Sequence, residues 1–151
     1  SNEIAEFFNK FSNSGKTYSR HDVMDMFGEK AFLVLQAGNS LVGILGWQVE
    51  NLIARTVDFM VMDHVPFEKA IPLLVQEMEN ASADLQCEIS LLYLSPIMAQ
   101  QEQIWKRLGY ELKNPDDLKV IAWINAAKES KPDGTRLYFK KLRQDRVLKP
   151  I

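Results

Sequence analysis

Two side chains that can accept a proton lie near the end of one apolar stretch of the sequence. Asp58 is the only acid inside Thr56–Met62, and His64 follows that stretch after Asp63. A carboxylate can act as a general base, and an unperturbed imidazole, which titrates at about pH 6.5, can do the same near neutrality. Asp58 and His64 are therefore candidate catalytic residues. A surface aspartate and a turn histidine are the alternative interpretation of the same two residues.

The elements around these candidates follow from hydrophobic periodicity. Ala54–His64 is typical of a strand, and Glu88–Leu94, short and almost entirely apolar, predicts a strand buried on both faces. Between them, apolar residues recur at the helical spacing i, i+3, i+4, i+7: Phe67, Ala70, Ile71, Leu74, Val75 and Met78. Two strands joined by a helix are expected to lie parallel, with the site at their carboxyl ends beside the helix N-terminus, here Asp63 to Ala70.

The remaining segments predict a mixed sheet covered by helices, an α/β fold of the α+β mixed-sheet kind with the order α-α-β-β-β-α-β-α-(β/α)-β. Gly38-Asn39 predicts a tight hairpin, and Gly43 and Gly46 predict a bulge or a close backbone approach. Residues 115–128 favour a helix that begins at Asn114-Pro115, with a strand over Leu118–Ile124 as the competing interpretation. The other expected elements are helices over Ile4–Phe11 and Arg20–Phe27 and strands over Ala31–Ala37, Leu41–Glu50 and Thr135–Leu142.

Composition restricts the class of protein. With 151 residues, 46% hydrophobic and 25% charged, the chain has the length and composition of a single globular domain over residues 1–151, with Ser1-Asn2 interpreted as a cloning scar. A net charge of −2 disfavours nucleic-acid binding, and no apolar run approaches the roughly 20 residues of a membrane span. Two distant histidines give no metal site, and a single cysteine, Cys87, excludes an internal disulfide. The expected location is the cytoplasm.

The segment that ends in Gln103–Tyr110 (Gln-Ile-Trp-Lys-Arg-Leu-Gly-Tyr) resembles the helix ending in Tyr-x-x-x-Gly-Phe of the GNAT superfamily of acyl-CoA-dependent N-acetyltransferases. The hairpin Ala31–Glu50, the long strand Ala54–His64 and the buried strand Ile89–Leu94 extend this resemblance over about 110 residues. It implies a GNAT-like acyl-CoA N-acyltransferase fold with acetyl-CoA as the cofactor. The resemblance places CoA beside the start of the helix, at Met62, Asp63, His64, Lys69 and Ala70.

The sequence departs from the family at that cofactor loop. Family members carry Arg/Gln-x-x-Gly-x-Gly/Ala, whose backbone amides hold the CoA pyrophosphate. Residues 63–72 contain neither glycine nor arginine; they carry the acids Asp63 and Glu68 and the donor-less Pro66 and Pro72. We therefore expect weak CoA binding, with Lys69 restoring part of the charge.

Two further departures concern the acid and the chain ends. Trp105 occupies the position of the tyrosine that protonates the leaving thiolate in many family members, and an indole cannot serve as that acid. Tyr93 is the candidate replacement, with Tyr110 as a second, and Asp58 is the candidate base on the long strand. No strand is predicted before Ile4, which suggests either a domain excised from a longer chain or a variant that lacks the family's first strand. The helix 115–128 is expected to be an addition to the family pattern.

These departures favour a divergent domain with a degenerate active site. The predicted function is ligand binding, regulation or protein interaction without efficient acetyl transfer. The alternative is an active acetyl-CoA-dependent N-acetyltransferase that modifies a small amine or a protein amine, and an unrelated α+β interaction module is the third interpretation. The expected partner is a small-molecule ligand or a protein, with homodimerisation left open, and neither nucleic acid nor a membrane.

Overall fold

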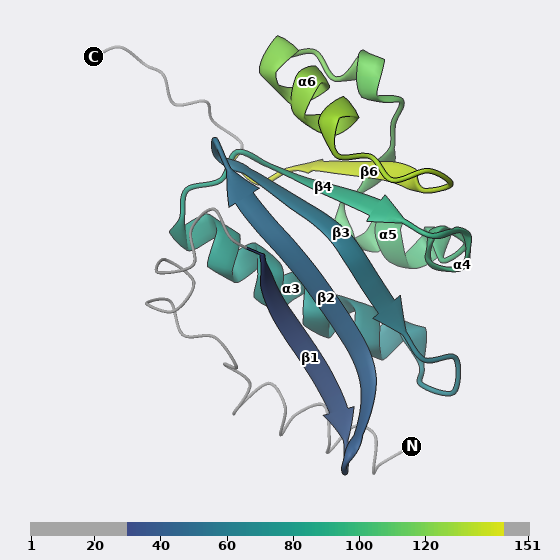
Figure 1. Ribbon diagram of the computed structural model, residues 1–151. Coiled ribbons are helices and arrows are strands. Elements are labelled where there is room, and N and C mark those ends of the chain that lie inside the picture. Colours follow the sequence, from purple (N-terminus) through teal and green to yellow (C-terminus); the bar gives the residue numbers. More distant parts are fainter. Residues whose placement is uncertain (1–29, 144–151) are drawn as a thin grey trace.

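The computed structural model describes residues 30–143, which form a six-stranded mixed sheet with helices on both faces (Figure 1). The strands are β1 (Ala31–Ala37), β2 (Ser40–Glu50), β3 (Ile53–Val61), β4 (Ile89–Leu94), β5 (Glu111–Leu112) and β6 (Arg136–Lys141), in the spatial order β1-β2-β3-β4-β6-β5. Among these described strands, only β3 and β4 pair in parallel. The predicted helices over Ile4–Phe11 and Arg20–Phe27 lie outside the described residues.

The crossover between the parallel strands is α3 (Phe67–Asp84), and its predicted apolar stripe is confirmed. Its buried residues are Ala70, Ile71, Leu74, Val75, Met78 and Ser82, which recur at helical spacing and face the sheet. Pro72 lies inside the first two turns, where its ring removes one hydrogen bond to the carbonyl of Glu68. Packing of the apolar stripe against the sheet therefore holds α3 together across this proline.

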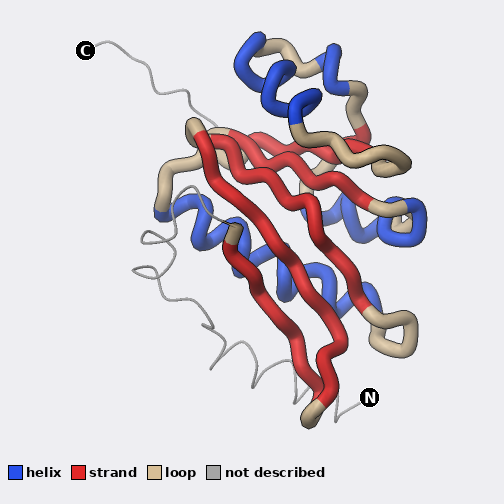
Figure 2. The backbone as a smooth tube through the Cα atoms, in the orientation of Figure 1, coloured by secondary structure: helices blue, strands red, loops and turns tan. Residues whose placement is uncertain are grey.

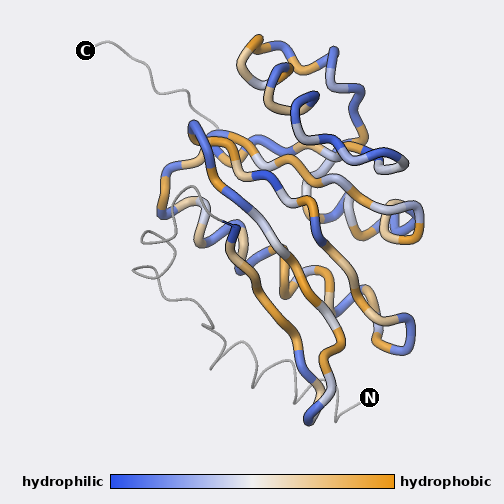
Figure 3. Tube along the Cα trace, in the orientation of Figure 1, coloured by the Kyte–Doolittle hydropathy of each residue, from blue (hydrophilic) through white to orange (hydrophobic). Residues whose placement is uncertain are grey.

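The sheet separates two hydrophobic cores, and β4 contributes to both. All six residues of β4 are buried, as its apolar sequence predicts. Even-numbered Leu92 and Leu94 pack with α3 and Trp105, whereas Leu91 and Tyr93 pack with Trp123 on the other face. In Figure 2 the strands form one twisted layer, and Figure 3 shows that the turn after β3 is hydrophilic while much of the strand surface is apolar. None of the helices in residues 30–143 is long and apolar enough to span a membrane.

The predicted helix over residues 115–128 is wrong at its N-terminal end. Pro115–Asp117 form a single 3-10 turn, η1, in which the Asn114 side chain accepts from the Asp116 amide at 3.0 Å. The chain is extended at Leu118 and Val120, and α6 begins at Ile121 and ends at Glu129. Leu118 is 2% exposed in the second core, so its burial overrides the local helix signal.

Other boundaries also differ from the predicted ones. The strand expected to end at His64 ends at Val61, because the chain turns over residues 62–65. Two short elements that periodicity does not reveal are α4 (Pro96–Ala99) and β5, and α5 (Glu102–Leu108) is the helix that leads into Gly109. Gly109 ends α5 with a φ of 92°, a left-handed conformation that glycine adopts without strain.

Candidate functional site

The parallel strands β3 and β4 pair over half of their length and then separate. Their register runs from Ile53 opposite Ile89 to Thr56 opposite Leu92, although β3 continues to Val61. Figure 1 shows their carboxyl ends pointing in different directions. The separation opens the sheet at the carboxyl ends of two parallel strands, which is where α/β folds bind ligands.

A bulge in β3 begins where this pairing ends. Gly46 pairs with Asp58 and Trp47 with Thr56, so Val57 has no partner on β2. A bulge bends its strand and increases its twist, which accounts for the departure of β3 from β4. The predicted bulge or close approach at Gly46 is confirmed: a Cβ there would lie 2.6 Å from Phe32 Cε1 and 3.2 Å from Asp58 Oδ2.

Asp58 lies on the part of β3 beyond its pairing with β4, two residues after the last paired residue, Thr56. It follows the bulge, is exposed, and forms an ion pair with Lys30 at 2.7 Å. His64 lies beyond the end of β3 in the turn before α3 and is also exposed. No hydrogen bond or ion pair joins Asp58 to His64, so the structure does not unite the two predicted bases in one catalytic pair.

Trp105 of α5 packs beneath β3 on the α3 side of the sheet. Its side chain is fully buried, and its indole N–H donates to the carbonyl of Met98 at 2.8 Å. The Phe59 ring of β3 contacts it edge-on with 5.8 Å between centroids. This residue fills space and fixes α4 to α5.

The two tyrosines proposed as acids occupy different faces of the sheet. The Tyr93 hydroxyl donates to the carbonyl of Ala127 in α6 at 3.1 Å, and burial raises the pKa of Tyr93 to about 12. The Tyr110 hydroxyl lies 2.9 Å from the Glu79 carboxylate and 2.8 Å from Ser90 Oγ. Burial, and then the Glu79 charge, raise the pKa of Tyr110 well above its ordinary value. Tyr93 and Trp105 lie on opposite faces of the sheet.

A third tyrosine, Tyr138 of β6, was not identified from the sequence. Its ring lies 6.1 Å from that of Trp105, and its hydroxyl donates to the carbonyl of Ala99 at 3.4 Å. Burial, and secondarily the Glu102 charge, raise the pKa of Tyr138. Strand alternation in the sequence predicts that Tyr138 and Phe139 point to opposite faces of the sheet. The proximity of Tyr138 to Trp105 could not be predicted, because it depends on β6 pairing with β4.

The predicted cofactor corner is a turn closed by its own backbone. The Met62 amide donates to Val42 O at 2.9 Å, and the Val65 amide donates to Met62 O at 3.1 Å. Pro66 has no amide, and the amides of Lys69 and Ala70 both donate to Pro66 O, at 3.1 and 3.0 Å. Only the amides of Phe67 and Glu68 remain at the start of α3 without an acceptor among the described residues.

The five predicted cofactor-binding residues divide into two groups. Asp63, His64 and Lys69 are exposed around this turn, together with Met62, whose exposed fraction is 43%. Ala70 lies on the buried face of α3, is fully buried and presents no side chain to a ligand. Within residues 30–143, no group of three or more His, Cys, Asp or Glu side chains is arranged to hold a metal ion.

Comparison with known proteins identifies the fold. Neither a protein-family model nor a curated protein matches the sequence, but many solved structures match the fold. A GNAT acetyltransferase from Staphylococcus aureus Mu50 is 13% identical, with a TM-score of 0.59 over 94% of this chain and 92% of that one. An acetyltransferase from Streptococcus agalactiae 2603 is 12% identical, with a TM-score of 0.60 over 92% of this chain and 89% of that one.

A structure that contains the cofactor is also similar. The PaiA N-acetyltransferase of Thermoplasma acidophilum, in complex with coenzyme A, is 13% identical, with a TM-score of 0.55 over 74% of this chain. The present chain spans 60% of the length of PaiA. The chain therefore has the fold of the GNAT N-acetyltransferases, a mixed α/β fold, and the resemblance noted in the sequence is confirmed at that level.

Proposed function

We propose that this domain uses the acetyltransferase fold without efficient acetyl transfer and acts in ligand binding, regulation or protein interaction. The observation that carries the proposal is the turn before α3. Its Val65 amide is bonded to Met62 O, and the next residue, Pro66, has no amide. An anion at a helix N-terminus binds to free amides, and among the described residues at the start of α3 only those of Phe67 and Glu68 remain, the second beside its own carboxylate.

The energetic consequence is large. A hydrogen bond to a charged group contributes about 1.5–3 kcal/mol, so the loss of two weakens binding by roughly two to four orders of magnitude. The acids Asp63 and Glu68 add repulsion at the same corner, and Lys69 supplies one compensating charge. The residues present do not fit the CoA pyrophosphate.

The buried Trp105 supports the same proposal. A positioned general acid contributes about 10²–10⁴-fold to a rate, and an indole whose N–H is bonded to Met98 O cannot supply it. Tyr93 and Tyr110 have raised pKa values and bonded hydroxyls, and Tyr93 faces α6. We therefore include none of the three in a catalytic site.

Calorimetric titration with CoA and with acetyl-CoA tests this proposal. We expect no saturation below about 1 mM, whereas micromolar binding at this corner would overturn it. A matched variant, P66G/E68G, restores an amide and removes an acid, and we expect it to gain affinity for CoA. Circular dichroism checks that this variant keeps its helices.

Acetyl transfer is the second candidate function, and the opening between β3 and β4 favours it. Asp58 lies on the part of β3 that has separated from β4, and its exposed carboxylate could act as the base for an amine substrate. An assay of acetyl-CoA with small primary amines and a lysine peptide tests this candidate. Turnover that disappears in D58N and H64A but persists in D133N, a change in an exposed turn, would support it. No turnover in the wild-type protein would remove it.

A further inference from the structure

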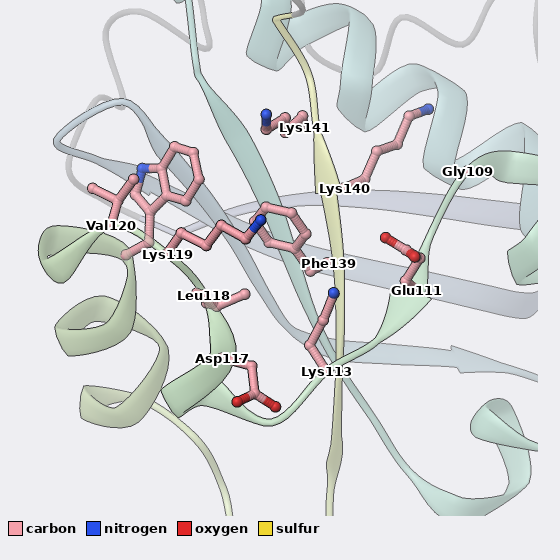
Figure 4. Close-up of a pocket in the computed structure, with 11 residues that line it drawn as sticks. Gly109, Glu111, Lys113, Asp117, Leu118, Lys119, Val120, Phe139, Lys140 and Lys141 are labelled. Atoms are coloured by element: carbon pink, nitrogen blue, oxygen red, sulfur yellow. The ribbon is translucent and has the colours of Figure 1, made fainter.

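A cavity of about 650 Å³ lies on the face of the sheet opposite α3, far along the chain from the turn at Met62–Pro66. Its wall on one side is the η1–α6 segment, and on the other it is β6 with the neighbouring β5 (Figure 4). The lining residues that matter here are Lys113, Leu118, Lys119, Trp123, Phe139 and Lys141. Cavities of this size accommodate small molecules.

The floor of the cavity is apolar and firmly held. Leu118, Trp123 and Phe139 belong to the second hydrophobic core, and each is at most 9% exposed. The rings of Trp123 and Phe139 lie 5.7 Å apart at an interplanar angle of 45°. Because packing from below fixes these side chains, their upper edges form a preformed apolar surface.

Three lysines surround this floor, and each comes from a different segment. Lys113 follows β5, Lys119 precedes α6 and Lys141 ends β6. Figure 4 shows Lys113 and Lys119 extending toward the Phe139 ring from different sides, with Lys141 farther along β6. Within residues 30–143, no carboxylate forms an ion pair with any of the three.

The neighbouring charged residues are arranged differently. Lys140 also lines the cavity but turns its ammonium group to the other face, where it pairs with Glu79 at 3.0 Å. The Asp117 carboxylate is directed away from the three ammonium groups, and Glu111 lies across β6 from Lys119 (Figure 4). One further carboxylate lies beside the floor, because Glu88 Oε1 accepts a hydrogen bond from the Trp123 indole at 3.4 Å. Lysines still outnumber acids in the lining, so the open side of the cavity presents net positive charge over a mainly apolar floor.

We propose that this cavity binds an organic phosphate whose flat ring or apolar body lies against Leu118, Trp123 and Phe139. Lysine ammonium groups are compact point charges that bind phosphate, and an anion relieves the repulsion between three unpaired cations. The inference goes beyond the proposed function, because it holds whether or not the turn before α3 binds CoA. The cavity exists because of η1 and α6, the addition to the family pattern.

The test is a titration with ATP, monitored by calorimetry and by tryptophan fluorescence. We expect saturable binding that weakens as salt rises, with a fluorescence change that disappears in W123F because Trp47 and Trp105 are buried elsewhere. The triple variant K113Q/K119Q/K141Q should lose at least tenfold in affinity. The matched control is K131Q, which replaces an exposed lysine in the turn before β6 and should bind ATP as the wild type does.

Several outcomes would overturn the inference. These are absence of saturation at millimolar ATP, equal affinity for ATP and adenosine, or an affinity unchanged in the triple variant. CoA also carries phosphates, so it could bind either at the turn before α3 or in this cavity. Lysine variants at each place distinguish the two sites. Loss of CoA binding in K69Q alone would overturn the proposed function and leave this inference intact, whereas loss in the triple variant alone would locate CoA in the cavity.

Discussion

The indole nitrogen of Trp105 lies 2.8 Å from the main-chain oxygen of Met98, and this bond joins α5 to α4 at the carboxyl end of β4. The rings of Phe59, Tyr110 and Tyr138 surround the same indole with centroids 5.8 to 6.1 Å away. Trp105 is thus a centre of packing at the position where the GNAT resemblance expects a tyrosine acid.

Replacing Trp105 with that tyrosine should therefore harm the protein. In W105Y the smaller ring leaves a void and Met98 O loses its donor, so we expect a loss of about 2–4 kcal/mol in the free energy of unfolding. Urea denaturation measures this loss, and comparison with W105F, which lacks a hydroxyl, shows whether the tyrosine hydroxyl replaces the indole as a donor to Met98 O. A W105Y protein with wild-type stability and new acetyltransferase activity would contradict the structural role.

Arg55 gives a second prediction, about buried charge. Its side chain is only 8% exposed. The guanidinium contacts Glu50 and donates to Glu129 at 3.0 Å and to Ser130 Oγ at 2.7 Å, and so ties β3 to the end of α6. The double variant E50Q/E129Q leaves this charge without a counter-ion, and we expect it to cost about 3 kcal/mol.

The opposite deletion should cost less. R55M removes the buried charge itself and returns two largely exposed carboxylates to water, so we expect about 1–2 kcal/mol. Chemical denaturation of the two variants checks this order. Equal losses, or a larger loss in R55M, would show that the aliphatic packing of Arg55 matters more than the ion pairs.

The sequence predicted α3 and β4 well because each carries a single periodic signal over its whole length. The start of α6 could not be predicted, because Leu118 leaves the helix pattern to fill a core built by β4 and β6, far away in sequence. For the candidate site, the shortage of amide donors at the turn before α3 could be predicted, because Pro66 stands in the local sequence. The face on which Tyr93 lies, and the meeting of Lys113, Lys119 and Lys141, depend on tertiary pairing.

Cys87 gives a prediction about pH. This cysteine is buried, and burial raises the pKa of its thiol from 9.0 to about 11. Between these values the unfolded chain loses the proton while the folded chain keeps it, so stability is full below pH 9 and falls as pH rises. We expect the stability difference between wild type and C87A to shrink from about pH 8.5 to about pH 10.5.

Denaturation at several pH values checks this trend. Tyr93 and Tyr110 contribute a fall of the same sign only above about pH 10, because their pKa values are also raised from 10. The comparison with C87A removes their contribution. A pH-independent difference between the two proteins, or rapid thiol alkylation of the folded protein at neutral pH, would contradict a buried neutral thiol.

Gly46 and Phe32 give the last prediction, which concerns the bulge that opens the sheet. A Cβ on residue 46 would lie 2.6 Å from Phe32 Cε1, so G46A should cost about 1–3 kcal/mol as the phenyl ring is displaced. In an F32A background the ring is absent and the same change should cost less, with a coupling energy of at least about 0.5 kcal/mol. A double-mutant cycle by urea denaturation measures this coupling. The added methyl also meets Asp58 Oδ2 at 3.2 Å, so a residual cost in the F32A background would measure the strain of this second contact. Additive costs of the two substitutions would contradict the contact between residue 46 and the Phe32 ring.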